Sequence, residues 1–242
     1  MSEHPPGTNV DTLSRRGIRL DQIQLERFER YSALLRQRNE QLNLTAIVDP
    51  AEIATKHFLD SLTLLLVDPP PADARLIDVG TGAGFPGLPL AIARPDLSVT
   101  VVESVAKKVR FLAEAVATLE LRRVEIAHAR AEELAHDGAH RERYDRAVVR
   151  ALPALASNLE LLLPFCHTGG AAVAYKGRIE DELPAARRAA ATLGGEIVRI
   201  ATTEELGLGE TLPGRCLVVA AKRRATPERY PRAAAEMKRR PW

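Results

Sequence analysis

The stretch 78–87, Asp-Val-Gly-Thr-Gly-Ala-Gly-Phe-Pro-Gly, constrains the fold of this chain more than any other feature. It follows a short apolar run at 75–77, typical of a strand buried in a parallel sheet, and Pro86 lies near the first turn of a helical stretch. Glycines let the backbone turn sharply and approach a ligand closely, and amides at a helix N-terminus carry partial positive charge. A second apolar run, 99–102, ends in Glu103. This combination indicates a nucleoside-binding site, because the carboxylate can accept hydrogen bonds from both ribose hydroxyls.

Two cofactor classes use such a turn, and the residues distinguish between them. Gly82, Gly84 and Gly87 match the G-x-G-x-x-G pattern of nicotinamide dinucleotide sites, but that match alone is weak. Asp78 precedes an additional glycine, Gly80, and the resulting D-x-G-x-G-x-G resembles the first motif of class I S-adenosylmethionine methyltransferases. In that family the acid lies near the ammonium group of the cofactor, whereas it would repel a pyrophosphate. We therefore favour S-adenosylmethionine over a dinucleotide and over a tight turn without a ligand.

Composition restricts the cellular setting and the chemistry. The length of 242 residues suits one catalytic domain with an N-terminal extension. No apolar run approaches the roughly 20 residues that cross a bilayer, and the polar first residues are unlike a secretory signal. Cys166 and Cys216 are the two cysteines, and their spacing fits neither a C-x-x-C pair nor a metal site. We expect a monomeric cytoplasmic protein without disulfides, metal or membrane partner.

Positive charge is concentrated at the C-terminal end. The whole chain has a net charge of +2, yet residues 222–242 contain eight basic and two acidic residues. Such a segment favours contact with nucleic-acid phosphates, although it is equally typical of a solubilising chain end. Proline and aromatic residues at 230–231 and 241–242 interrupt the charges, which favours docking onto a surface. Because the segment follows the last expected strand, we expect its removal to leave cofactor affinity nearly unchanged.

Periodicity divides the chain into four parts. Residues 1–12 are expected to be disordered, 13–71 to form a helical extension, 72–222 to form the cofactor-binding domain and 223–242 to form a basic tail. Alternating strands and helices in the third part predict a Rossmann-like, seven-stranded, mostly parallel α/β sheet. The expected strands are 75–79, 98–103, 123–127, 144–149, 170–175, 195–202 and 215–221; the expected helices are about 20–41, 50–67, 86–94, 105–119, 153–163 and 179–193.

Residues that directly follow the strands should lie near the ligand, because open α/β sheets bind ligands at the carboxyl ends of their strands. After the third strand, Ala131 and Glu132 are expected to reach the edge of the adenine. The alternative is that Glu132 and Glu133 are ordinary charges in the first turn of a helix. After the fourth strand, Arg150 should point into the crevice near the transferred methyl group. A guanidinium in a cleft needs a partner, so we expect a carboxylate such as Asp78, or an RNA phosphate, to meet it.

The end of the fourth strand also excludes some methyl acceptors. Residues 150–153 read Arg-Ala-Leu-Pro, unlike the Asn/Asp-Pro-Pro-aromatic run typical of enzymes that methylate exocyclic amines. Methylation of a pyrimidine C5 needs a cysteine nucleophile, and neither Cys166 nor Cys216 is placed for attack. Guanine N7 fits these absences, because its lone pair is free at neutral pH and needs no general base. Proximity and favourable placement of charge would then supply much of the rate.

Several motifs occur in an order that is specific to one family. They are Asn43-Leu-Thr-Ala-Ile47, Lys56-His-Phe-Leu-Asp-Ser61, the stretch 78–87, Lys107-Lys-Val-Arg-Phe-Leu112, Val149-Arg-Ala151 and Lys176-Gly177. Over about residues 20–222 the chain thereby resembles the bacterial small-subunit rRNA methyltransferase G family, also called glucose-inhibited division protein B. The resemblance implies S-adenosylmethionine-dependent methylation of N7 of guanine 527 in the decoding-site loop, with 16S rRNA or the 30S subunit as partner.

The resemblance and the residue patterns together give a set of candidate site residues. Arg150 is the catalytic candidate, which would hold the cofactor and the base in register. The cofactor-binding candidates are Asp78, Gly80, Gly82, Gly84, Phe85, Glu103, Ala131, Glu132 and Arg150. The RNA-binding candidates are Lys107, Lys108, Arg110, Lys176, Arg223, Arg224, Arg229 and Arg232, although a solvated helix face explains the first three equally well.

Two questions stay open at this point. His57 and Asp60 lie three residues apart on one helix face, so either they contact the base, or His57 packs between domains and Asp60 caps a turn. The function itself has two alternatives: a methyltransferase of the same fold that acts on a small molecule or a protein, and a non-catalytic RNA-binding or cell-division factor. The intact glycines, Glu103 and Arg150 argue against the second alternative.

Overall fold

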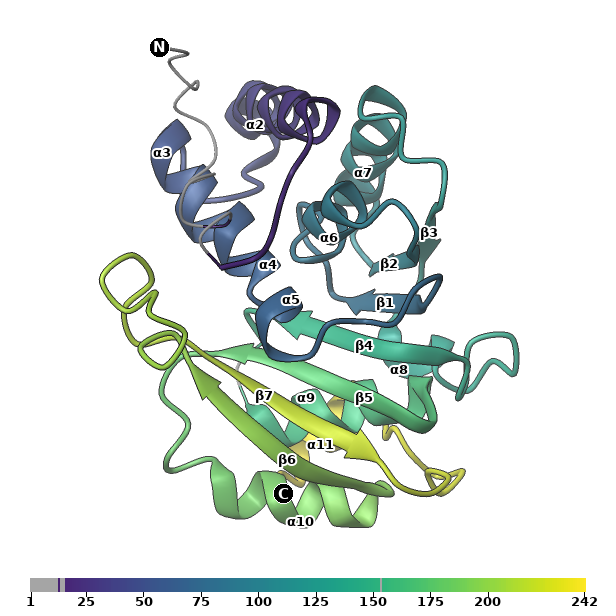
Figure 1. The fold of residues 1–242 in the computed structure, drawn as a ribbon. Coiled ribbons are helices and arrows are strands. Elements are labelled where there is room, and N and C mark those ends of the chain that lie inside the picture. Colours follow the sequence, from purple (N-terminus) through teal and green to yellow (C-terminus); the bar gives the residue numbers. More distant parts are fainter. Residues whose placement is uncertain (1–12, 14–15, 153) are drawn as a thin grey trace.

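The computed structural model describes residue 13, residues 16–152 and residues 154–242, so the segment 1–12, expected to be disordered, lies outside the described residues. Within these ranges seven strands form one sheet in the order β3-β2-β1-β4-β5-β7-β6 (Figure 1). The first five strands run parallel, and β7 runs antiparallel to both β5 and β6. The predicted seven-stranded, mostly parallel sheet is therefore confirmed.

The observed strands follow the predicted ones closely. They are β1 (Arg75–Val79), β2 (Ser98–Glu103), β3 (Val124–His128), β4 (Tyr144–Arg150), β5 (Cys166–Lys176), β6 (Gly195–Thr202) and β7 (Cys216–Lys222). The largest difference concerns β5, which begins at Cys166 instead of 170. Its first residue pairs with Tyr144, and the register then shifts before regular pairing resumes at Ala171. Two adjacent glycines at this irregularity resemble a turn in the sequence, which explains the difference.

The helices agree where the apolar periodicity is long. The helical elements of the described chain include α2 (Gln22–Leu42), α3 (Pro50–Glu52), η1 (Ile53–Leu59), α4 (Asp60–Leu62), α5 (Leu64–Val67), α6 (Gly87–Ala93), α7 (Ala106–Thr118), α8 (Ala131–Leu134), α9 (Leu155–Leu162), η2 (Leu163–Phe165), α10 (Leu183–Thr192) and α11 (Ala234–Arg239). Helix α10 begins later than the expected 179, because Pro184 favours the first turn of a helix. Helix α11 was not predicted, and α8 was anticipated only by the alternative that places Glu132 and Glu133 in the first turn of a helix. Both helices are too short for a periodic pattern.

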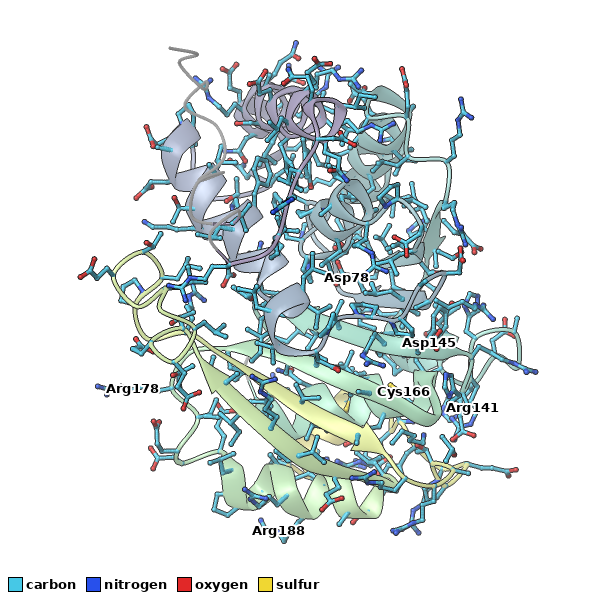
Figure 2. The ribbon with its side chains drawn as sticks, viewed as in Figure 1. Asp78, Arg141, Asp145, Cys166, Arg178 and Arg188 are labelled. Carbon is cyan, nitrogen blue, oxygen red and sulfur yellow. The ribbon has the colours of Figure 1, made fainter. Side chains whose placement is uncertain are left out.

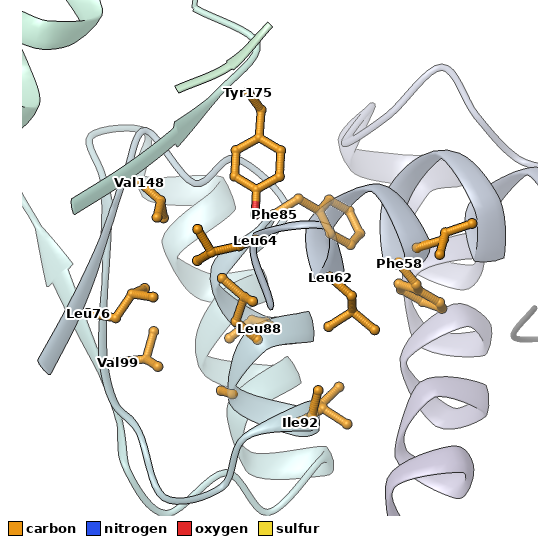
Figure 3. Packing of buried hydrophobic residues seen from close by; sticks show 14 of the residues in the cluster. Phe58, Leu62, Leu64, Leu76, Phe85, Leu88, Ile92, Val99, Val148 and Tyr175 are labelled. Atoms are coloured by element: carbon orange, nitrogen blue, oxygen red, sulfur yellow. The ribbon is translucent and has the colours of Figure 1, made fainter. Parts of the chain in front are cut away.

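Each face of the sheet packs against its own group of helices. On one face lie α2, the segment α3–α5, α6 and α7, and on the other lie α8, α9 and α10 (Figure 1). Figure 3 shows Leu76, Val99 and Val148 of the sheet on the side that faces Leu88 of α6, with Ile92 of the same helix farther from the strands. Adjacent strand residues alternate between the two faces, so consecutive apolar residues pack on opposite sides, as Val101 and Val102 of β2 do. Because β2, β1 and β4 are adjacent and parallel, this packing holds their carboxyl ends side by side.

The N-terminal helices reach the carboxyl ends of these strands. Asp21 caps α2, and its carboxylate accepts from the backbone N–H of Gln24 at 2.8 Å. The expected second helix begins after the Asp49 cap, as predicted, but its middle part, Ile53–Leu59, forms a π-helix. Such wider turns occur frequently at functional sites. Here the segment carries His57 and leads directly into Asp60, and both side chains face Arg150.

Candidate active site

The glycine-rich turn after β1 presents two of its glycines to open space. Gly80 and Gly82 adopt φ of +66° and +63°, a left-handed conformation that disfavours other residues. A Cβ at Gly80 would meet only Leu152, at 4.0 Å, and a Cβ at Gly82 would meet nothing within 4 Å. A Cβ at Gly84, by contrast, would lie 2.6 Å from a Leu88 methyl group. Gly84 therefore serves packing inside the turn, whereas Gly80 and Gly82 leave room for a ligand.

Asp78 supports this turn from beneath. Its side chain is fully buried, and its Oδ2 accepts from the Thr81 hydroxyl at 2.6 Å and from the backbone N–H of Gly87 at 2.7 Å. Burial raises the pKa of Asp78 to about 6, against the lowering effect of these two hydrogen bonds. The carboxylate thus fixes the shape of the turn and is not open to direct contact with a ligand.

Glu103 lies at the end of β2 beside a cavity of about 230 Å³. One carboxylate oxygen accepts from the N–H of Gly82 at 3.1 Å, and the other accepts from those of Ser104 and Val105 at 2.9 Å each. The structure brings the predicted adenine and ribose residues together here. The cavity is lined by Val79, Gly80, Val102, Glu103, Ser104, Ala129, Arg130, Ala131, Glu132, Leu152, Leu161, Ala234 and Met237. Glu132 also lies in the first turn of α8, so the structure leaves both interpretations of this residue open.

Arg150, at the end of β4, is held by three polar contacts and one ring. Its Nη1 donates to Asp60 Oδ2 at 2.9 Å and to the carbonyl of Lys56 at 3.1 Å, and its Nη2 donates to His57 Nδ1 at 3.1 Å. The guanidinium carbon lies 5.0 Å from the centre of the Phe85 ring. The expected carboxylate partner therefore exists, but it is Asp60 and not Asp78. Asp78 is already committed to the turn, and the π-helical segment brings Asp60 within reach.

His57 is fixed between the N-terminal helices and the glycine-rich turn. Its ring stacks on Phe85, with centres 4.4 Å apart, and its Nε2 lies 2.8 Å from the Thr45 hydroxyl. Because Nδ1 accepts from Arg150, Nε2 carries the proton and donates to Thr45. Burial, reinforced by the charge of Arg150, lowers the pKa of His57 to about 3. The imidazole is consequently neutral, with neither nitrogen free to accept a proton.

These residues surround a second cavity of about 360 Å³ that continues the first. Gly80 and Leu152 line both cavities, so the two meet at the glycine-rich turn. Figure 3 shows the apolar residues beneath, where Phe85 lies near Tyr175 and Leu62. The lining of the second cavity comprises Leu44, Thr45, His57, Gly80, Thr81, Gly82, Ala83, Phe85, Lys108, Arg150, Ala151 and Leu152. Leu152, which lines both cavities, was not among the predicted site residues. In this segment only Arg150, a charged residue at the end of a strand, indicated a functional site.

The predicted cationic residues divide into those near the site and those elsewhere. Lys107, Lys108 and Arg110 lie on α7 directly after Glu103; Lys108 Nζ is 3.8 Å from Glu103 Oε2, and Arg110 is exposed. Lys176 differs from the expectation, since it is buried and its Nζ lies 3.1 Å from Glu182 Oε1. Its burial leaves no surface for an RNA phosphate.

The tail arginines lie away from the cavities. Arg223 pairs with Glu196 at 3.0 Å, and Arg224 donates to the carbonyl of Ala191. Both residues follow β7, which is antiparallel to β5 and therefore ends beside the start of β5. They consequently lie near the amino ends of the parallel strands, whereas the cavities lie at the carboxyl ends. Arg232 pairs with Glu160 at 2.6 Å, and Arg229 lies 5.0 Å over the Tyr230 ring. None of these four residues lines either cavity. In Figure 2, Arg178 and Arg188 likewise point outward from the molecule.

The cysteines lie outside both cavities. Cys166 and Cys216 are buried, and burial raises their pKa values to about 12 and about 11, so neither supplies a thiolate nucleophile. Among the described residues no group of three histidine, cysteine or carboxylate side chains is arranged to hold a metal ion. None of the described helices is both long and apolar enough to cross a bilayer.

Comparison with known proteins places this site in one family. Residues 24–207 match the family model described as rRNA small subunit methyltransferase G. The ribosomal RNA small subunit methyltransferase G of Roseiflexus castenholzii is 49% identical over 231 residues, covering 93% of this chain and 94% of the relative. That of Roseiflexus sp. strain RS-1 is 46% identical over 238 residues, covering 96% and 97%.

A solved structure supports the fold. The SAM-dependent methyltransferase from Aquifex aeolicus superposes with a TM-score of 0.54 at 15% identity, covering 76% of this chain and 97% of that one. At this identity the likeness establishes the class I methyltransferase fold and no more. The sequence match over most of the chain establishes the rest. The protein belongs to the rRNA small subunit methyltransferase G family.

Proposed function

We propose that this protein transfers the methyl group of S-adenosylmethionine to N7 of guanine 527 in 16S rRNA. Family membership supports the reaction class, and one observation supports the chemistry: His57, which lines the second cavity, is neutral and has both ring nitrogens hydrogen-bonded. Such a site suits an acceptor whose lone pair is free at neutral pH. The family resemblance indicates 16S rRNA, free or within the 30S subunit, as the substrate of a monomeric cytoplasmic enzyme.

The residues around the two cavities fit S-adenosylmethionine. Gly80 and Gly82 leave a cradle that a Cβ would narrow, Glu103 offers carboxylate oxygens for ribose hydroxyls, and apolar side chains surround the space beside it. When bound, the cofactor supplies an electrophilic methyl group on a sulfonium. Asp78 contributes a buried negative charge beneath the turn, which favours a cationic ligand above it. These residues bind and orient, and none has to move a proton.

Arg150 is the residue that we assign to positioning the acceptor. Asp60, Lys56 and His57 fix its guanidinium, and Phe85 supports it from one side. A planar group held in this way can keep base and cofactor in register, which is the main requirement for a reaction without proton transfer. Pairing with Asp60 also reduces its repulsion of a guanine that becomes cationic at N7.

We propose that Lys107, Lys108 and Arg110 contact RNA phosphates. They lie in the first half of α7, and Lys108 lines the second cavity. Lysine and arginine are the usual residues for such sequence-independent contacts. Lys107 donates to the carbonyl of Leu42 and Lys108 pairs with Glu103, so these lysines would exchange a partner for a phosphate. Arg223, Arg224 and Arg232 are also paired, and they are weaker candidates because none of them lines either cavity.

The function is tested by mapping N7-methylguanosine in 16S rRNA from cells with and without this protein. We expect the modification at position 527 to disappear in the deletion strain and to return with the parent gene. The matched control is complementation with the Glu103→Ala variant, which should restore it poorly. Unchanged modification in the deletion strain would contradict the proposal and favour a small-molecule or protein acceptor.

Replacing Glu103 with Ala should weaken S-adenosylmethionine binding by about 1.5–3 kcal/mol, because charge-assisted hydrogen bonds to the ribose are lost. Calorimetric titration measures this change directly. Glu133→Ala is the control, since Glu133 is exposed one residue from the cavity lining. Equal affinity of the Glu103 variant and the parent, or tighter binding of NAD than of S-adenosylmethionine, would contradict the assignment.

Cofactor affinity should fall as the pH drops through about 6, where the carboxylate of Asp78 takes up a proton. A raised pKa means that the folded protein keeps the anion only above that value, so at pH 5 about a tenth remains ionised and affinity should fall by up to about tenfold. Between pH 7 and pH 9 neither Asp78 nor His57 changes charge, so turnover should be level. The same acid-side loss in Asp78→Asn, or a rate that follows the titration of His57, would contradict this.

A further inference from the structure

The last residues of the chain return from the far edge of the sheet to the cofactor cavity. We define the C-terminal arm as residues 226–242. At its start Thr226 is fixed near the end of β7, where its N–H donates to Glu142 Oε1 at 2.8 Å and its hydroxyl donates to the carbonyl of Leu193 at 2.7 Å. Near its other end, α11 places Ala234 and Met237 in the lining of the cavity beside Glu103. The arm therefore runs from the amino ends of the parallel strands, where β7 finishes, to their carboxyl ends, where the cavity lies.

One buried carboxylate anchors the arm. Glu160, on α9, is fully buried and accepts four hydrogen bonds from the arm. Three come from Arg232, through its backbone N–H at 2.9 Å, Nε at 2.8 Å and Nη2 at 2.6 Å, and one comes from Trp242 Nε1 at 2.6 Å. The Arg232 guanidinium also lies 5.0 Å from the centre of the Trp242 ring, which is 5.7 Å from that of Tyr230. A charged group buried with this many partners fixes its surroundings firmly.

Met237 adds an apolar side chain to the wall of the cavity beside Glu103. Its side chain is half-buried and shares the cavity lining with Leu152 and Leu161. A thioether is flexible and makes favourable contacts with aromatic rings. The carboxylate of Glu103 lines the same cavity, so a nucleoside bound through its ribose would bring its base close to this wall.

We propose that the C-terminal arm completes the cofactor site, with Met237 contacting the adenine ring of S-adenosylmethionine and Glu160 acting as the positioning residue that holds the arm in place. The proposal rests on the proposed cofactor. The family model matches residues 24–207, so the arm lies outside the part of the chain that defines the family. It also replaces the expectation that removal of the tail leaves cofactor affinity unchanged, because that expectation ignored the return of the arm to the cavity.

Hydrogen exchange on the unaltered full-length protein gives the first test. S-adenosylhomocysteine, the demethylated product, should slow amide exchange both in the turn 80–84 and in α11, at residues 234–239. Protection of the turn without protection of α11 would overturn the arm proposal and leave the proposed function intact. Protection of neither segment would contradict both.

Substitutions give the second test. Met237→Asp should weaken S-adenosylhomocysteine binding about tenfold, because it places a charge against the adenine, whereas Met237→Leu should stay within about twofold of the parent. Arg223→Ala is the matched control, since it removes a basic tail residue whose partner, Glu196, lies at the opposite edge. Equal affinity of Met237→Asp and the parent, or an equal loss in Arg223→Ala, would overturn the proposal.

The role of Glu160 is tested through Trp242→Ala, which removes one of its four hydrogen bonds without leaving it unpaired. A released arm should raise the KM for S-adenosylmethionine several-fold, whereas kcat and the KM for rRNA should stay near the parent values. A general structural defect would change all three constants together, and that result would overturn the positioning role.

Discussion

Arg150→Lys is expected to bind S-adenosylmethionine nearly as well as the parent and to transfer the methyl group about 100-fold more slowly, since a small misplacement of reacting groups costs this much. Lysine keeps the positive charge but cannot reach Asp60, Lys56 and His57 together, and it loses the planar contact with Phe85. The acceptor base would then lose its fixed neighbour. A single-turnover assay with saturating cofactor measures the step directly.

The same strand provides a matched control. Arg146 of β4 pairs with Asp68 at 2.7 Å, which makes it a second partly buried arginine–aspartate pair, remote from both cavities. Arg146→Lys should therefore leave the single-turnover rate within about twofold, because the charge and the pair are largely retained there. Equal rates for Arg150→Lys and the parent would contradict the positioning role, and equal loss in both variants would indicate a general effect of strand β4.

Asp60→Ala is expected to have the largest effect on stability, lowering the free energy of unfolding by about 3–5 kcal/mol. The side chains of Arg150 and Asp60 are only 10% and 4% exposed, so the variant leaves a guanidinium buried without its anion. The carbonyl of Lys56 and the imidazole of His57 are neutral and cannot replace that charge. Denaturant unfolding at pH 7 measures the loss.

An exposed pair supplies the comparison for this prediction. Glu196→Ala breaks the contact between Glu196 and Arg223, whose side chains are 61% and 59% exposed, respectively. This variant should change the free energy of unfolding by at most about 1 kcal/mol. Asp60→Asn should lie between the two, since it keeps one hydrogen bond to Arg150 but removes the charge. A loss in Asp60→Ala no larger than that in Glu196→Ala would show that the buried pair does not stabilise this site.

Much of the fold and part of the site could be predicted from local sequence. Apolar runs with turn residues between them predicted the bounds of β1 and β2 without error, because a strand covered on both faces carries consecutive apolar residues, as Leu76-Ile77 and Val101-Val102 do. The glycine-rich turn and Glu103 were located by the same logic, since their positions relative to the strands follow from chain connectivity. Ala131 and Glu132 line the cavity beside Glu103, as expected for residues that follow a parallel strand and so lie at its carboxyl end.

Charge by itself predicted less well. Lys176 was grouped with the RNA-binding candidates, but its place at the end of a buried strand puts it beside Glu182 in the interior. The tail was treated as one basic surface, although Arg232 neutralises Glu160 and Arg223 neutralises Glu196. A basic residue in a sequence shows a charge, whereas its availability depends on carboxylates that are far away along the chain.

The sequence by itself determined the order of strands and helices, the glycine-rich turn, the acid after β2 and the family, because each depends on residues that are neighbours in the chain. Only the tertiary structure decided which groups meet across the sheet edge. Asp60, and not Asp78, pairs with Arg150 over a separation of 90 residues, and Met237 reaches the cavity of Glu103 through an arm anchored at Glu160. Such contacts form because buried charges and apolar side chains must find partners, and no local pattern records which partners the packed fold brings near.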